Sequence, residues 1–394
     1  MDRARPVLTA FENIDTKGLG ERLRAARGKA GLTQEDAAVA LGLARTTLVA
    51  IEKGQRRIRP EELRETAKLY KTAVSSLLRP EAVQIDVVPR FRAMPGAKAV
   101  AATEAGALLA DLAAAEAELE RLVGQPLRPN YPPERPIGPG DVIEQARDAA
   151  AELRHRLGLG LAPVSDPVGL LQLELGMRVF VRPFNSAISG AFLFDDQVGA
   201  CVLLNRKHPP ERRLQTALHE VGHFVSARHE PDVVDLDRTP QTREERFAKA
   251  FGLEFSMPAS LVRGRFQDMR REAGRFSPRH LILLTRYFHV SPEAMCRRLE
   301  DLGLVKQGTW DSLKERGFST EHMREVIGEG DAERRDAVTT PRLWLLATEA
   351  YRRDLLSEGQ LARMLRMDRL EIRAMLDALG GEVEEDDLGS FSPA

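Results

Sequence analysis

The sequence has few cysteines and no long apolar run, and each absence excludes a class of protein. Only two cysteines, Cys201 and Cys296, occur in 394 residues, and neither belongs to a Cys-x-x-Cys pair. A disulfide-stabilised scaffold is therefore excluded, and we expect two buried thiols in a reducing compartment. No apolar run approaches the roughly 18 residues of a membrane span, and no signal-peptide pattern is present. We therefore expect a cytoplasmic protein with no membrane partner.

The composition that is present suits several globular domains. Hydrophobic residues make up 43% of the chain and charged residues 30%, which allows for both buried cores and a soluble surface. A chain of this length predicts two or three domains. The net charge is only −1, but residues 1–80 contain 16 Lys and Arg against 10 Asp and Glu. This local positive charge is what contact with a phosphate backbone requires.

The most informative motif is the pentapeptide at 219–223, in which His219 and His223 flank Glu220. Apolar residues at helical spacing surround it, namely Leu214, Ala217, Leu218, Val221, Phe224 and Val225. On a helix, residues i and i+4 share a face, so both imidazoles are directed at one point and suit a divalent ion, most often Zn²⁺. Glu220 is rotated by about 100° from His219 and is free to take a proton from a water at the metal. The motif therefore predicts metal-assisted hydrolysis.

A catalytic zinc site needs a third protein ligand, and two candidates compete for this position. His229 has the spacing found in metzincins, but Ser226 stands where that pattern needs a helix-breaking glycine. Glu245 opens a second predicted helix, on which Ala248 and Gly252 share its face. These small residues would allow close approach to the helix of the motif. We therefore favour Glu245 as the third ligand.

Several segments together carry a resemblance to the ImmA/IrrE family of metallopeptidases. They are Asp166-Pro167-Val168, Leu175 to Val179, Ile188 to Phe192, Leu204-Asn205, Arg212, His219 to His223, Glu245-x-x-Ala248-x-x-Phe251 and Met257-Pro258. The resemblance covers roughly residues 145–300. It implies a zincin-like α+β domain in which His219, His223 and Glu245 hold zinc and Glu220 is the catalytic base. Residues 188–194 are expected to form the strand along which an extended substrate pairs.

A second pattern near the N-terminus predicts two short helices joined by a tight turn. Thr33 is placed as an N-cap, Gly42 lies in the turn, and the next helix is expected from Ala44 to Lys53, closing at Gly54. Such a pair presents its second helix to a DNA major groove. The stretch resembles the XRE or Cro-like helix-turn-helix family. The resemblance implies that Gln34 holds a phosphate, that the start of the second helix reads bases, and that basic residues after it meet the DNA backbone. The predicted DNA-binding residues are Gln34, Arg45, Thr46, Thr47, Lys53, Arg56 and Arg57.

The remaining segments are predicted to be a linker, a helical C-terminal region and a tail. An Ala- and Leu-rich helix over 101–125 needs a partner for its apolar face, either in a dimer or on the peptidase. The proline-rich stretch 126–140 is predicted to be a semi-rigid spacer. Helices are expected over 319–327 and 341–352, and residues 357–379 have a helix-turn-helix rhythm that suits a packing module or a second DNA reader. Five acidic residues over 382–387 predict a disordered tail.

Taken together, these patterns predict a mainly α protein with a small antiparallel β-sheet, composed of a five-helix helix-turn-helix bundle, a zincin-like domain and a helical C-terminal region. The predicted domains are 18–80, a linker 81–140, 141–305, 306–380 and a tail 381–394. The predicted function is a DNA-binding transcription regulator, expected to be a homodimer on a double-stranded operator. Its zinc endopeptidase domain would cleave a repressor or antitoxin-like partner. The alternative is a non-proteolytic regulator or antitoxin whose metal domain is a sensor or partner dock.

Overall fold

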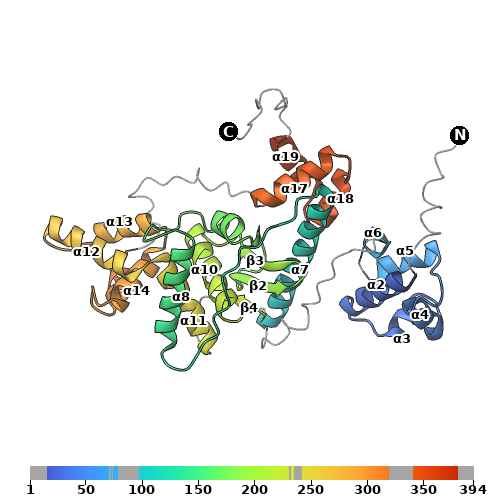
Figure 1. Ribbon diagram of the computed structural model, residues 1–394, viewed down its shortest axis with the longest axis horizontal. Helices are drawn as coiled ribbons and strands as arrows, with labels where there is room; N and C mark the ends of the chain where they lie inside the picture. Colours follow the sequence, from blue (N-terminus) through green and yellow to red (C-terminus); the bar gives the residue numbers. More distant parts are fainter. Residues whose placement is uncertain are drawn as a thin grey trace. The chain divides into compact units, whose positions relative to one another are not determined.

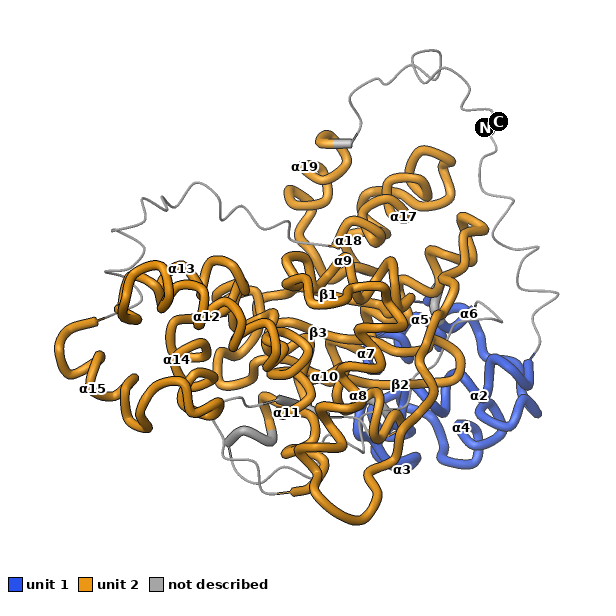
Figure 2. The backbone as a smooth tube through the Cα atoms, turned by 60° about the vertical axis from the view of Figure 1, so that its left-hand side comes forward, with its two compact units in different colours: residues 1–84 blue, residues 85–394 orange. Residues whose placement is uncertain are grey.

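The chain forms two compact units, residues 1–84 and 85–394 (Figure 2). The computed structural model describes residues 16–70, 72, 74–78, 97–229, 232–234, 242–318 and 340–379. The helix predicted over 319–327 and the predicted acidic tail lie outside this range. Within it, no helix is long and apolar enough to cross a membrane.

The first unit is the predicted five-helix bundle (Figure 1). Its helices are α2 (Thr16–Lys29), α3 (Gln34–Ala40), α4 (Arg45–Glu52), α5 (Pro60–Leu69) and α6 (Val74–Leu78). Thr33 caps α3 as predicted, in a reciprocal pair with Asp36. Gly42, in the turn between α3 and α4, has a φ of +65°, a conformation that glycine adopts without strain. The predicted pair of short helices with a tight turn is therefore confirmed.

The second unit is built on a four-stranded sheet, and this sheet is mixed rather than antiparallel as predicted. The strands are β1 (Arg178–Arg182), β2 (Gly190–Asp195), β3 (Gly199–Asn205) and β4 (Asp232–Val234), in the order β1-β3-β2-β4. Strands β2 and β3 form an antiparallel hairpin. Strand β3 lies between β1 and β2 and pairs in parallel with β1. The sequence pattern identifies strands but does not define which strand is the neighbour of which.

The two faces of the sheet are covered by different helices. Alternate strand residues such as Val179, Phe192 and Val202 belong to the core that includes α10 (Pro210–Ser226). Residues of the opposite parity, such as Phe180 and Leu203, are also buried, on the face contacted by α7 (Ala97–Val123). Because both faces are buried, the strands are nearly continuous apolar runs.

Helix α7 is part of the second unit and also contacts the first two of the three described C-terminal helices. These are α17 (Pro341–Arg352), which matches the predicted helix, α18 (Glu358–Met364) and α19 (Arg369–Leu379). The proline-rich stretch after α7 also lies on this unit, because Tyr131 Oη accepts a hydrogen bond from the Ala200 amide and the Arg135 amide donates to Val225 O. Helix α7 thus packs on the sheet of the second unit, which is one of the two alternatives expected for its apolar face. The proline-rich stretch lies on the same unit, where a linker was predicted.

The other described helices of this unit precede or follow α10 in the chain. They are α8 (Val142–Arg156), α9 (Pro167–Gly169) with the π-helical η2 (Leu170–Glu174), α11 (Arg243–Ser256), α12 (Ala259–Ala273), α13 (Pro278–Phe288), α14 (Pro292–Asp301) and α15 (Thr309–Glu315). Buried Arg298 of α14 pairs with Glu254 and donates to Met257 O at 2.9 Å. This contact joins α14 to the end of α11.

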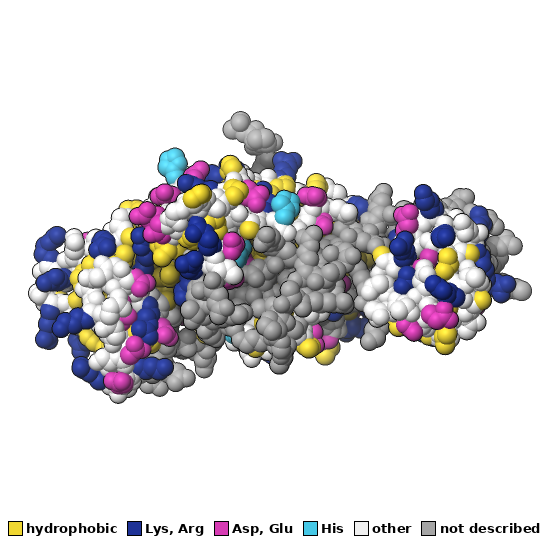
Figure 3. Space-filling view, turned by 90° about the horizontal axis from the view of Figure 1, so that it is seen from below, with side chains coloured by type: hydrophobic (Ala, Val, Ile, Leu, Met, Phe, Trp, Pro, Cys, Tyr) yellow, Lys and Arg dark blue, Asp and Glu magenta, His cyan; other side chains and the backbone are white. Residues whose placement is uncertain are grey.

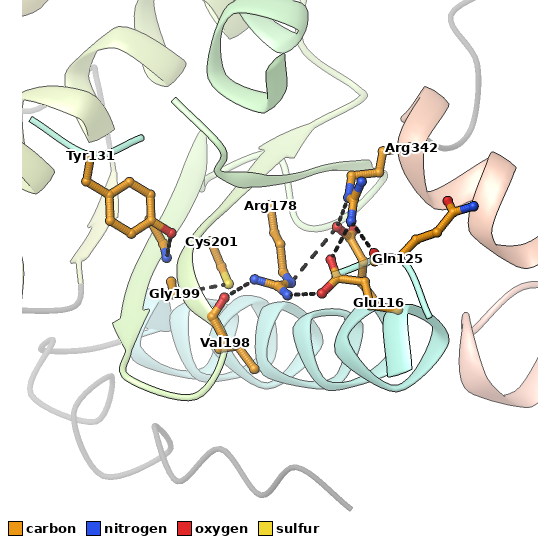
Figure 4. Close-up of polar contacts among 10 residues, drawn as sticks. Glu116, Gln125, Tyr131, Arg178, Val198, Gly199, Cys201 and Arg342 are labelled. Carbon is orange, nitrogen blue, oxygen red and sulfur yellow. Dashed lines mark hydrogen bonds and ion pairs between the residues drawn. The ribbon is translucent and has the colours of Figure 1, made fainter. Parts of the chain in front are cut away.

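A buried cluster of charges joins α7, β1 and α17 (Figure 4). Glu120 accepts from Arg178 at 2.6 Å and from Arg342 at 3.0 Å. Glu116 is fully buried beside the same two arginines, with Arg342 Nε at 3.5 Å. Burial raises the pKa of Glu116 to about 7, although the two arginines oppose the shift. The C-terminal helices are thus attached to the sheet layer through ion pairs as well as apolar contacts.

Candidate functional site

The two histidines of the motif lie on α10 where the helix is buried. His219 and His223 are each 5% exposed, and their Nε2 atoms are 3.1 Å apart. The apolar residues around them pack in the main core, as their spacing predicted. A helix held on all sides keeps the two imidazoles in a fixed relative position, which a metal site requires.

Glu245 completes a cluster with these histidines. It lies in the first turn of α11, where the Thr242 side chain accepts a hydrogen bond from its amide at 3.2 Å. Its carboxylate oxygens are 3.5 Å from His219 Nε2 and 3.6 Å from His223 Nε2. Ligand atoms about 2.0–2.1 Å from one tetrahedral ion lie roughly 3.3 Å apart, so the three separations fit a single zinc-sized ion. The residues present therefore form a possible metal site.

The approach of α11 to α10 depends on small residues, as the sequence suggested. A Cβ on Gly222 would lie 2.7 Å from the Ala248 Cα, and a Cβ on Gly252 would lie 3.3 Å from the His219 amide nitrogen. The two helices thus meet almost backbone to backbone. This contact sets the separation between the histidines and Glu245.

Glu220 lies beside the cluster and faces the sheet. It is fully buried, and a Cβ on Gly190 at the start of β2 would be 3.4 Å from its Oε1. That Cβ would also lie 2.5 Å from Thr216 Cγ2, so a larger residue at 190 would push the strand away from α10. The carboxylate is therefore enclosed between the motif helix and the first residue of a strand.

Asn205, a residue without a predicted role, positions the loop before β2. Its buried side-chain amide donates to Ile188 O at 2.8 Å and to Asn185 O at 3.1 Å. The loop that these bonds hold leads directly into Gly190. The segments Ile188 to Phe192 and Leu204-Asn205 were part of the family resemblance, but a single sequence shows no contact between them.

His229, the other candidate ligand, does not belong to the cluster. It is exposed beyond the end of α10 and lies edge to face with the Phe194 ring, with centroids 5.0 Å apart. Helix α10 continues through Ser226, whose hydroxyl donates to Gly222 O at 3.0 Å. The early helix break that a metzincin-like ligand at 229 requires is absent here.

The substrate strand predicted over 188–194 is not an open edge. At Gly190–Phe192, strand β2 pairs with β3 on one side and with β4 on the other. On this side of β2, the outermost described strand is β4. The prediction was wrong because the short strand 232–234 lacks a clear period-2 pattern and was not recognised.

In the first unit, several predicted DNA-binding residues lie exposed on or beside α4. Arg45 and Thr46 are exposed at its start, Thr47 is half-buried, and Lys53 and Arg57 are exposed after its end. The Arg45 guanidinium lies 3.6 Å from Glu35 and is 63% exposed, so this ion pair leaves it accessible.

Two other predicted DNA-binding residues have partners within the unit. Gln34 donates to Glu52 at 2.8 Å, and buried Glu52 is also bound by Arg27 at 2.7 Å. Arg56 makes two hydrogen bonds to Glu62, an arrangement that raises the pKa of Arg56 and lowers that of Glu62. A phosphate contact by Gln34 or Arg56 would compete with these bonds.

Comparison with family models identifies both segments. Residues 172–300 match the IrrE N-terminal-like domain, which is classed as a peptidase family, and residues 18–78 match a helix-turn-helix domain. The predicted resemblance is confirmed. The IrrE N-terminal-like match includes β1 to β4, the motif helix α10 and helix α11, and the helix-turn-helix match spans α2 to α6. A comparison of the whole chain with curated proteins found no match. The chain therefore combines a DNA-binding type of domain with a metallopeptidase-like domain.

Proposed function

We propose that this protein is a DNA-binding transcription regulator whose second unit is a zinc-dependent endopeptidase acting on a repressor or antitoxin-like protein. The observation that carries the proposal is the convergence of His219, His223 and Glu245 beside the enclosed Glu220. Two imidazoles and one carboxylate are a donor set of catalytic zinc sites, which leave one position open. Zinc held there would supply Lewis acidity toward a peptide carbonyl and a water molecule.

Residues of the chain would carry out proton transfer, enclose the catalytic carboxylate and bind the substrate. Glu220 would take a proton from the attacking water and return it to the leaving amine, because it lies next to the ligands without being one of the three. Gly190 and the loop held by Asn205 would keep that carboxylate enclosed. Strand β4, the outermost described strand next to β2, would offer the edge on which an extended peptide pairs.

The metal assignment is tested by the zinc content of purified variants. Glu245→Ala is expected to lose stoichiometric zinc, whereas His229→Ala is expected to retain it. Circular dichroism of both variants controls for folding. If zinc is lost with His229→Ala and kept with Glu245→Ala, the ligand assignment is wrong.

The peptidase assignment is tested by comparing protein N-termini in cells that express either the wild-type protein or Glu220→Gln. The substitution keeps the size of the side chain and removes the base, so zinc and DNA binding are expected to remain. New N-termini within a DNA-binding repressor or an antitoxin-like protein are expected only with the wild type. Identical N-termini under all inducing conditions would instead support a regulator whose metal domain acts as a sensor or partner dock.

A further inference from the structure

A cavity separate from the metal centre opens among the helices that follow α11. Its volume is about 410 Å³, within the range of about 300–1,000 Å³ typical of small-molecule sites. The lining residues come from α12 to α15 and their connections, and none belongs to α10 or α11. The cavity is therefore independent of the proposed catalytic residues.

The walls of this cavity are mainly apolar. Phe266 and Phe276 lie on one side with ring centroids 4.5 Å apart, and Leu281, Leu299 and Val305 contribute aliphatic surface. The buried Cys296 also lines the cavity, and burial raises the pKa of its thiol to about 11, so this group is neutral at physiological pH. A ligand that fills the interior must therefore have an apolar body.

Two arginines, Arg270 and Arg275, also line the cavity. Arg270 and Arg275 are both exposed, and among the described residues neither has an ion-pair or hydrogen-bond partner. The adjacent Arg271, by contrast, pairs with Asp268 at 3.6 Å. Figure 3 shows several Lys and Arg side chains on the surface at the left, in the part of the second unit that contains α12. A pair of available guanidinium groups suits a carboxylate, which arginine binds through two parallel hydrogen bonds.

We propose that this cavity binds a small amphipathic carboxylate, a medium-chain fatty-acid anion, with the chain inside and the head group on Arg270 and Arg275. The apolar walls favour an alkyl chain, and the two arginines favour a carboxylate. A neutral chain satisfies only the walls, and a short carboxylate satisfies only the arginines. This site does not depend on peptidase activity.

The test is calorimetric titration of the full-length protein with decanoate, with decanol and acetate as partial ligands. Decanoate is expected to bind with one-to-one stoichiometry, decanol about tenfold or more weakly, and acetate without measurable heat. The combined change Arg270→Gln and Arg275→Gln is expected to weaken decanoate binding by about tenfold or more, since hydrogen bonds to charged groups contribute about that factor or more. Arg263→Gln is the matched control, because Arg263 is exposed on the same helix and does not line the cavity.

Two further variants separate binding in the cavity from other effects. Val305→Trp places a bulky ring at the half-buried wall and is expected to abolish binding, with thermal unfolding confirming that the variant is folded. Glu245→Ala is expected to bind decanoate as the wild type does, so failure of the proposed peptidase would not affect the result. Absence of decanoate binding, equal binding of decanol, or unchanged binding in the double arginine variant would each overturn the proposal.

Discussion

Replacing Gly222 with alanine is the most direct test of how the metal site is assembled. The added Cβ would lie 2.7 Å from the Ala248 Cα, whereas ordinary van der Waals contact begins at 3.4 Å. Because the atom it meets is backbone, α11 must move away from α10 by several tenths of an ångström. Overpacking of this kind costs about 1–3 kcal/mol, and alanine returns up to about 1 kcal/mol of helix propensity. We expect a net loss of about 1–2 kcal/mol in the free energy of unfolding and weaker zinc binding.

The assay is urea unfolding together with zinc titration, and two other glycines serve as controls. A Cβ on Gly252 would lie 3.3 Å from its nearest neighbour, and a Cβ on Gly264 of α12 would meet nothing within 4 Å. Gly252→Ala is therefore expected to have a smaller effect, and Gly264→Ala to increase stability by up to about 1 kcal/mol with zinc binding unchanged. If Gly222→Ala matches the wild type in stability and in zinc affinity, the separation of α10 and α11 does not control the site.

Three further predictions concern charged groups. Burial raises the pKa of Glu116 to about 7, so the folded state holds this proton more tightly than the unfolded state does. The contribution of Glu116 to the free energy of unfolding is therefore lost as pH rises from about 4.5 to about 7. Glu116→Gln should flatten this pH dependence, as measured by urea unfolding at a series of pH values. Glu52→Ala leaves Arg27 without its buried partner and should destabilise the first unit by about 3 kcal/mol, measured by circular dichroism; an unchanged midpoint would contradict this. Arg57→Gln should reduce the slope of log affinity for DNA against log salt by about 0.9 without changing stability. Arg56→Gln should also destabilise the protein, because Arg56, unlike Arg57, forms an ion pair with Glu62.

Features defined by local residue spacing could be predicted from the sequence. The i, i+4 histidines placed both imidazoles on one helix face, and the small residues Ala248 and Gly252 indicated close helix approach. Thr33 and Gly42 defined the start and turn of the helix pair for the same reason. The histidine spacing, the cap and the turn each act within a few residues, where backbone geometry decides the outcome, and the small residues define one face of one helix.

Features that depend on pairing between distant segments could not be predicted in this way. The parallel pairing of β1 with β3 is set by the position of a hairpin, and the pairing of β4 with β2 involves only three residues. The resemblance predicts that Gln34 holds a phosphate, but its hydrogen bond to Glu52 depends on how α3 packs against α4. No periodicity in a single sequence records which polar side chains meet after the chain has folded.

The position of α7 also determines the order in which the second unit can fold. Arg342 and Arg353 donate to the carbonyls of Gln125 and Val123, partners separated by 217 and 230 residues. The proposed metal ligands His219 and Glu245 are separated by fewer than 30 residues. On a chain synthesised from its N-terminus, α7 is complete long before its C-terminal partners exist. We therefore expect the metal-site helices to assemble first, leaving the outer face of α7 exposed to chaperones or to other chains until the last helices are made.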